Sequence, residues 1–308
     1  MSKCRMDLAR LGELAARLEA GYADGIGVNP DSKDKLPRRD ELIELTEKLL
    51  EVLFPGFNLG HISANPLPHL MTLHDDLVDQ ICRAARSGEH RTCSGSPEAC
   101  RCRTDDSCCG SAAMKLLNEL PAIREILKAD VKAAYNGDPA ATSYDEIVLS
   151  YPGLRAVAVQ RLAHVLYEAG VPLLPRMMTE YAHQQTGIDI HPGARLGRGV
   201  FIDHGTGVVI GETAILGDDV RIYQGVTLGA GNFPKDANGM LIKGRKRHPT
   251  IGSRVIIYSG ASVLGDVTIG DDSVVGGNVW LTRSLPPGTK ITASPPGNRL
   301  KFAEDRGK

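Results

Sequence analysis

Two short segments in the second half of the chain hold the residues best suited to proton transfer. Asp189 opens the run Asp-Ile-His-Pro-Gly-Ala, and the run Asp-His-Gly-Thr-Gly contains Asp203 and His204. A carboxylate beside an imidazole fixes the tautomer of the ring and stabilises its protonated form, which makes the histidine a general base. We therefore predict that His204 accepts a proton from a substrate and that Asp189 orients its ring.

The elements that carry these segments follow from a six-residue repeat. Neither an α-helix nor an ordinary sheet has this period, whereas a parallel β-helix points one apolar residue per face inward at every turn. Asp189 and His204 lie about one coil of three hexads apart, so they are expected at the same corner. The apolar residues of the repeat are Ile190, Leu196, Ile202, Ile210, Leu216, Ile222, Leu228, Ile251, Ile257, Val263, Ile269, Val275 and Leu281.

The repeat is interrupted at two places that hold candidate functional residues. One step is eight residues long instead of six, and the surplus around His204 pushes this side chain out of the regular wall. The second interruption, 229–249, is rich in Gly, Lys and Arg and ends in Arg247 and His248. Long insertions in a compact repeat are usually functional, so we expect an arm that covers a substrate.

The chain divides near residue 187 into a helical part and the β-helix. A length of 308 residues suggests about two domains, and leucines recur upstream at the three- and four-residue spacings of helices. Proline near the starts and glycine at the stops predict a last pair of helices, 151–170 and 172–185. The predicted class is α+β. Its expected parts are a helical domain 1–187, a β-helix domain 188–285 that includes the arm 229–249, and a tail 286–308.

Composition and charge exclude several classes of partner. The formal net charge is -1 and the pI is near 6.8, which gives no electrostatic reason to bind nucleic acid or an anionic membrane. No apolar run reaches the roughly 18 residues of a membrane helix, and the N-terminus lacks a hydrophobic signal core. We expect a cytoplasmic protein whose partner is a small molecule or another protein.

Five of the seven cysteines lie within seventeen residues, surrounded by Ser, Gly, Asp and Arg, which predicts a loop between helices. Such clusters in a reducing compartment bind metals or hold reduced thiols. Their spacing matches neither the paired C-x2-C of zinc sites nor the common iron-sulfur runs, so a loop of reduced thiols is preferred to a metal site. These residues are Cys93, Cys100, Cys102, Cys108 and Cys109.

Four runs together resemble serine O-acetyltransferase, which makes O-acetylserine for cysteine biosynthesis. The resemblance covers about residues 137–301 and is far more specific than a hexapeptide repeat alone. It implies an N-terminal α-helical domain followed by a left-handed parallel β-helix that assembles into a trimer. The runs are Asp189-Ile-His-Pro-Gly-Ala, Ile202-Asp-His-Gly-Thr-Gly-Val-Val-Ile-Gly-Glu-Thr-Ala, Gln224-Gly-Val-Thr-Leu-Gly and Arg247-His-Pro-Thr-Ile-Gly.

The resemblance assigns a role to each candidate residue. It makes His204 the base for the serine hydroxyl and Asp189 the partner that orients it. Asp138 and Asp203 would hold the amino group of L-serine. Arg247 would hold the carboxylate, for which its guanidinium offers a bidentate fork, and His248 would sit near the serine side chain. Considered without the family, Asp138 before a proline fits a helix cap equally well.

The second substrate implied is acetyl-CoA, with no metal required. By family position its pantetheine arm would lie near Ala230 and Ser259, in the groove between neighbouring β-helices of a homotrimer or a dimer of trimers. Cysteine resembles serine closely enough to be an inhibitor at the same anchors. Candidate cations for the coenzyme phosphates are Lys243, Arg245, Lys246, Lys290, Arg299 and Lys301.

The chain departs from the family in its long arm and in its C-terminus. A charged Lys308 replaces the apolar isoleucine with which some members dock into O-acetylserine sulfhydrylase, which puts that complex in doubt. The main alternative is another hexapeptide O-acetyltransferase that acts on a sugar or xenobiotic hydroxyl. A γ-type carbonic anhydrase needs an H-x4-H histidine pair, which His191, His204 and His248 do not provide. A non-enzymatic trimeric scaffold would leave the displaced His204 unexplained.

Overall fold

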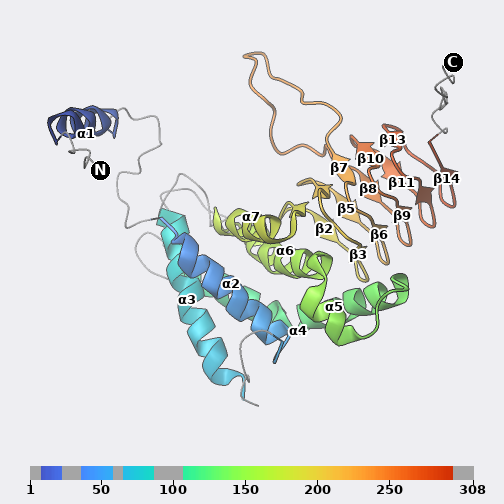
Figure 1. Cartoon of the computed structure of the whole chain (residues 1–308), viewed down its shortest axis with the longest axis horizontal. Coiled ribbons are helices and arrows are strands. Elements are labelled where there is room, and N and C mark those ends of the chain that lie inside the picture. The colour runs from blue at the N-terminus through green and yellow to red at the C-terminus, as the bar shows by residue number, and fades with distance from the viewer. Residues whose placement is uncertain (1–7, 23–35, 58–64, 87–106, 294–308) are drawn as a thin grey trace, which may run out of the picture.

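The computed structural model describes residues 8–22, 36–57, 65–86 and 107–293, which form a helical part followed by a column of short parallel strands (Figure 1). Cys93, Cys100 and Cys102 lie outside the described residues, as do Arg299 and Lys301. The helices are α1 (Leu8–Tyr22), α2 (Arg39–Leu53), α3 (Leu67–Arg86), α4 (Ser107–Gly137), α5 (Tyr144–Ser150), α6 (Pro152–Glu168) and α7 (Leu174–Thr186).

Helices α2 to α7 share one apolar core, whereas α1 has no buried residue and lies apart from it (Figure 1). Leucines at three- and four-residue spacings on α2 point inward, including the fully buried Leu49. Cys108 and Cys109 begin α4, and Cys109 is buried. The prediction that all five clustered cysteines lie in a loop is therefore wrong for these two, because the apolar pattern of α4 extends to its first turn. None of the described helices is long and apolar enough to span a membrane.

The predicted pair of helices before the β-helix is confirmed as α6 and α7. Each has proline in its first turn, and the glycines that follow them, Gly170 and Gly187, have φ values of 74° and 70°. This left-handed conformation is easily adopted only by glycine, which ends a helix and redirects the chain. Gly187 directs the chain from α7 straight into the first strand.

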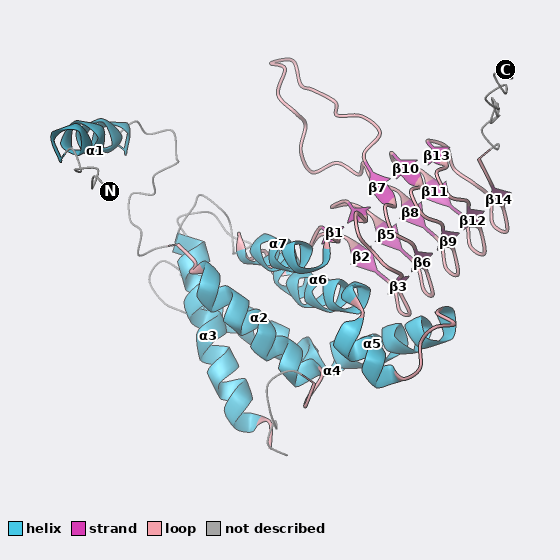
Figure 2. Ribbon diagram, in the orientation of Figure 1, coloured by secondary structure: helices cyan, strands magenta, loops and turns pink. Residues whose placement is uncertain are grey.

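Fourteen strands in the described chain form three parallel sheets that make the walls of a β-helix (Figure 2). Sheet A has the order β1-β4-β7-β10-β13, sheet B the order β11-β8-β5-β2, and sheet C the order β14-β12-β9-β6-β3. The strands are β1 (Asp189–Ile190), β2 (Arg195–Leu196), β3 (Phe201–Ile202), β4 (Val209–Ile210), β5 (Ile215–Leu216), β6 (Arg221–Ile222), β7 (Thr227–Gly229), β8 (Thr250–Ile251), β9 (Ile256–Ile257), β10 (Ser262–Leu264), β11 (Thr268–Ile269), β12 (Val274–Val275), β13 (Trp280–Leu281) and β14 (Lys290–Ile291).

The hexad prediction is confirmed by the register of these strands. Each predicted apolar residue lies in a strand and points inward; Leu196 alone among them is partly rather than fully buried. Ile190 pairs with Ile210, which pairs with Leu228, so successive inward residues stack one coil apart. The coil continues past residue 285, where the sequence placed its end, because β14 pairs with β12.

Helix α6 covers the first coil and supplies hydrogen-bond partners to its carbonyl groups. Gln160 Nε2 donates to Ala194 O at 2.7 Å, and Arg161 donates to the carbonyl oxygens of Leu196 and Gly197. Arg161 also forms a buried ion pair with Asp130 of α4, at 2.9 Å between Nε and Oδ2. These contacts hold α4 and α6 on the first coil. They therefore fix the position of the helical part relative to the candidate site.

Candidate active site

His204 lies in the turn from β3 to β4, residues 203–208, which we call the His204 corner. Its φ of 57° is in the left-handed region, an uncommon conformation for a residue with a side chain and one found at functional sites. The side chain is 70 % exposed, and its Nε2 lies 3.8 Å from Oδ1 of Asp203. The chain regains the regular register at Gly207, whose N–H donates to Gly187 O. The two surplus residues therefore lift the imidazole out of the wall, as the sequence predicted.

Asp138 reaches the same corner from the end of α4. Its Oδ1 accepts a hydrogen bond from Ala140 N at 2.8 Å, and its Oδ2 accepts one from the Tyr151 hydroxyl at 2.5 Å. The Tyr151 bond foremost lowers the pKa of Asp138, and the charges of His204 and Arg221 add to the effect. Asp138 does not cap a helix, because the cap of α5 is Ser143, which accepts from Glu146 N. A carboxylate with a lowered pKa thus stands near His204.

Arg247 and His248 lie on another corner, between sheets A and B. We call the turn after β4, residues 211–214, together with the arm 230–249 that leads into β8, the Arg247 corner. Arg247 pairs with Oε2 of Glu212, whose Oε1 accepts a hydrogen bond from the Tyr167 hydroxyl at 3.0 Å. Arg247 N also donates to Thr213 Oγ1. Thr213 therefore holds the backbone of Arg247, and Glu212 holds its guanidinium.

His248 is buried and neutral. Its Nδ1 accepts a hydrogen bond from Thr213 N at 3.1 Å, which leaves the ring proton on Nε2. Burial, with the charge of Arg247 second, lowers the pKa of His248 to about 4. The ring packs on Gly211, where an added Cβ would come within 2.2 Å of Nε2. A side chain at Gly211 would therefore displace His248.

The two corners are separated by the width of sheet A. The five steps along the chain from Gly207 to Glu212 span roughly 16 Å at about 3.3 Å per residue. A serine molecule is too small to bridge that distance. One chain therefore brings Asp138, Asp203 and His204 together, and brings Arg247 and His248 together, but keeps the two groups apart.

Asp189 stands outside both groups in the described chain. Its Oδ1 lies 3.5 Å from Nη1 of Arg176 on α7, so it pairs with this guanidinium rather than with His204. Asp189 also approaches Glu180 and His183, with one potential ligand atom of each within 4.8 Å of the others. Arg176 pairs with Glu180 as well, so one guanidinium serves both carboxylates of this cluster. The pairing of Asp189 with His204 stays a prediction.

The residues expected near the coenzyme also divide between the two corners. Ala230 begins the arm, whereas Ser259 lies in the turn from β9 to β10, at the same edge of the β-helix as His204. The arm rises away from the coils (Figure 1) and exposes Phe233 and Met240. Lys246, a candidate for the coenzyme phosphates, instead donates to Thr213 O at 2.6 Å and so holds the base of the arm.

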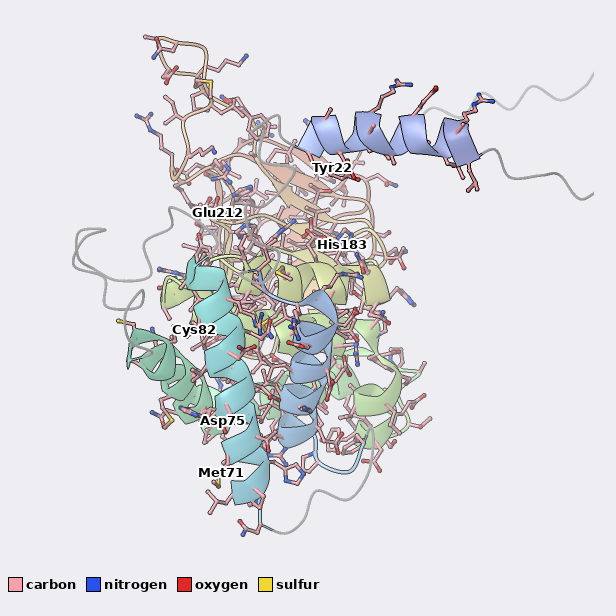
Figure 3. All side chains as sticks on the ribbon, turned by 90° about the vertical axis from the view of Figure 1, so that its left-hand side faces the viewer. Tyr22, Met71, Asp75, Cys82, His183 and Glu212 are labelled. Carbon is pink, nitrogen blue, oxygen red and sulfur yellow. The ribbon has the colours of Figure 1, made fainter. Side chains whose placement is uncertain are left out.

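Tyr151, Tyr167 and Glu212 are site residues that sequence reasoning missed. Glu212 lies within the run that carries the family resemblance, but nothing in its type or spacing singles it out. In Figure 3, Glu212 and His183 lie on opposite sides where the helices meet the coils. Tyr151 directly precedes α6, and Tyr167 lies in it. Only the folded structure shows that their hydroxyls reach carboxylates.

Comparison with known proteins identifies the family. A plasmid-encoded serine acetyltransferase of Synechococcus elongatus is 47% identical over 262 residues, which cover 83% of this chain and 82% of that protein. The chain belongs to the serine acetyltransferase family. Residues 248–283 also match the model for the bacterial transferase hexapeptide (six repeats). The resemblance drawn from the sequence, to an acyltransferase of this family, is thereby confirmed.

Solved structures of serine acetyltransferases have the same fold. Isoform 3 from Entamoeba histolytica, in complex with cysteine, covers 96% of each chain at 34% identity with a TM-score of 0.69. The enzyme from Brucella abortus strain S19, in complex with coenzyme A, covers 83% of this chain and 91% of its own at 28% identity with a TM-score of 0.56. The predicted fold, helices followed by a left-handed β-helix, is confirmed.

Proposed function

We propose that this chain transfers the acetyl group of acetyl-CoA to the hydroxyl of L-serine, which yields O-acetylserine and coenzyme A. Besides family membership, one observation carries the proposal. One corner presents two carboxylates and an exposed imidazole, and the other presents a guanidinium held by Glu212. A small zwitterion needs an anionic anchor, a cationic anchor and a base for its hydroxyl.

In the proposed reaction His204 takes the proton of the serine hydroxyl as its oxygen attacks the thioester carbonyl of acetyl-CoA. The tetrahedral intermediate collapses with cleavage of the carbon–sulfur bond, and the imidazolium returns its proton to the departing thiolate. Asp138 and Asp203 bind the serine ammonium, and Arg247 binds its carboxylate. Because His248 is neutral, it offers its Nε2 proton to an oxygen of the substrate without adding a charge.

The imidazole needs a carboxylate to stabilise its protonated form, and two are available. Asp203 lies 3.8 Å from the ring. Asp189 begins β1, which pairs with β4, the strand that directly follows the His204 corner. Asp189 would have to leave Arg176 to reach His204. We assign Asp189 the orienting role in the reacting complex, as the family resemblance implies.

The proposal includes a trimer, because a complete site needs the His204 corner of one copy beside the Arg247 corner of the next. Both corners border sheet A, so three copies with sheet A turned toward a common axis would join the corners in pairs. The outward residues of this sheet are mostly small or apolar, which favours close approach; they include Val209, Thr227, Ser262 and Trp280. The pantetheine arm would then run between Ala230 of one copy and Ser259 of its neighbour.

Cysteine shares the ammonium and carboxylate of serine, so we propose that it competes through Asp138 and Arg247. The decisive experiment measures thiol release from acetyl-CoA with serine, with sugars and with no acceptor, and identifies the product by mass spectrometry. Release that depends on serine and yields O-acetylserine is expected. Equal release with a sugar would instead support the alternative acyltransferase, and release that ignores the acceptor would refute acetyl transfer to serine.

A further inference from the structure

Tyr151 joins the helical part to the His204 corner. It precedes α6, and its ring stacks on Phe201 of β3 with 6.5 Å between ring centroids and an interplanar angle of 28°. Phe201 lies two residues before Asp203 in the chain. The phenol hydroxyl donates to Oδ2 of Asp138 at 2.5 Å. One side chain therefore packs on the strand that leads to Asp203 and holds the carboxylate of Asp138, which interacts with the charge of His204.

The backbone beside Asp138 is pressed against the β-helix. A Cβ on the preceding Gly137 would come within 2.4 Å of Arg221 Nη2 and 2.9 Å of Phe201 Cδ1. This close approach fixes the backbone position of Asp138, and the hydrogen bonds from Ala140 and Tyr151 fix the orientation of its carboxylate. A carboxylate oxygen has about two acceptor sites, so each oxygen of Asp138 keeps one for a ligand.

The energetics of Asp138 argue against a purely structural role. The side chain is half-buried, and water at its exposed part could satisfy its charge without any help from the protein. Both oxygens are nevertheless held by the protein, and this arrangement keeps the carboxylate in one orientation. Burial, with the Asp138 bond second, raises the pKa of Tyr151, so the phenol remains a donor throughout the working range. A fixed, partly exposed carboxylate near His204 is preorganised for a cation.

We propose that Tyr151 is a positioning residue that holds Asp138 for the ammonium group of the acceptor and thereby sets the preference for acceptors that carry an amino group. This inference rests on the proposed function, since it assumes that serine is the acceptor. It assigns no chemistry to Tyr151 itself, which acts through Asp138. The hydroxyl of Tyr151 is the group that holds Asp138, whereas its ring only packs on Phe201.

The test compares Tyr151→Phe with the wild type, using serine and 3-hydroxypropionate, which has the hydroxyl and carboxylate but no amino group. Phenylalanine keeps the stacking and removes the hydrogen bond. The KM for serine should rise about tenfold, equivalent to about 1.4 kcal/mol, while kcat and the KM for acetyl-CoA change less than about threefold. The kcat/KM for 3-hydroxypropionate should not change, because it has no ammonium for Asp138 to bind.

Two further variants separate positioning from general damage. Tyr144→Phe removes a hydroxyl from an exposed tyrosine whose ring contacts Tyr135, and it should behave as the wild type. In an Asp138→Asn background, Tyr151→Phe should cause no further rise in the KM for serine, since coupled residues are not additive. A normal KM for serine in Tyr151→Phe, or an equal loss with both acceptors, would overturn the inference. Failure of the wild type to acetylate serine would refute the proposed function instead.

Discussion

The separation of the two corners predicts that two inactive variants restore each other. His204→Ala removes the base and keeps the Arg247 corner, whereas Arg247→Ala keeps the base and removes the carboxylate anchor. General-base catalysis contributes on the order of 10² to 10⁴ in rate, and loss of a paired charge costs about 2 kcal/mol or more. Each variant alone should therefore have a kcat/KM for serine at least about thirtyfold below the wild type.

The magnitude of the recovery follows from the proposed cyclic trimer. In a ring of three, every trimer that contains both variants has one place where an intact His204 corner meets an intact Arg247 corner. Heterologous contacts in such a ring thus give one complete site in three, so mixed trimers should show about one third of wild-type activity. This fraction does not depend on whether the trimer contains one copy or two of either variant.

The assay requires trimers that carry both variants. The two chains are co-expressed with different affinity tags, purified over both columns in turn and checked for size before thiol release is measured. Mixed trimers of two differently tagged His204→Ala chains give the background. Recovery near one third supports a site shared between chains, and activity no higher than the background would refute the joining of the two corners.

Three further predictions concern the base, a buried histidine and the cysteines. His204→Ala should lower kcat at least about a hundredfold, and Asp189→Asn should lower it less because the imidazole remains; near-normal turnover of His204→Ala would remove the mechanism. Because the folded state lowers the pKa of His248 from 6.5 to about 4, the unfolded chain binds more protons between these values, and the free energy of unfolding should fall by up to about 3 kcal/mol as pH decreases from 6.5 to 4. Urea titrations of His248→Asn should show less of this slope, and an unchanged slope would contradict the assignment. Cys109→Ser should lower the melting temperature because that thiol is buried. Serine acetylation should stay within about twofold when serine replaces Cys93, Cys100, Cys102 and Cys108, and a larger loss would show that these thiols support the site.

The β-helix could be predicted from the sequence because its physical cause is local and periodic. An apolar inward residue recurs at every sixth position, so each coil can be recognised in the sequence. The eight-residue step at His204 departs from this period, and the structure has an irregular turn there. Similarly, prolines and glycines at the ends of α6 and α7 act within a single turn of chain. Local signals of this kind require no knowledge of the tertiary structure.

The supporting residues of the site could not be predicted, because their contacts join distant parts of the chain. Tyr167 and Glu212 are 45 positions apart in sequence, and Thr213 and His248 are 35 positions apart. The position of Asp189 beside Arg176 depends on how α7 lies over the first coil. The start of α4 at Ser107 was missed because its first turn, rich in Cys, Gly and Ser, has the composition of a loop.

The covering of the first coil by α6 bears on how this protein remains a discrete particle. A solenoid of parallel strands ends in a row of peptide groups that would pair with any similar row, so bare ends favour end-to-end growth into fibres. Gln160 and Arg161 donate hydrogen bonds to carbonyl groups of that row. Arg161 is also held in place by its buried ion pair with Asp130. Removal of the helices would therefore do more than delete a domain. It would expose a templating edge, and the isolated coils should polymerise.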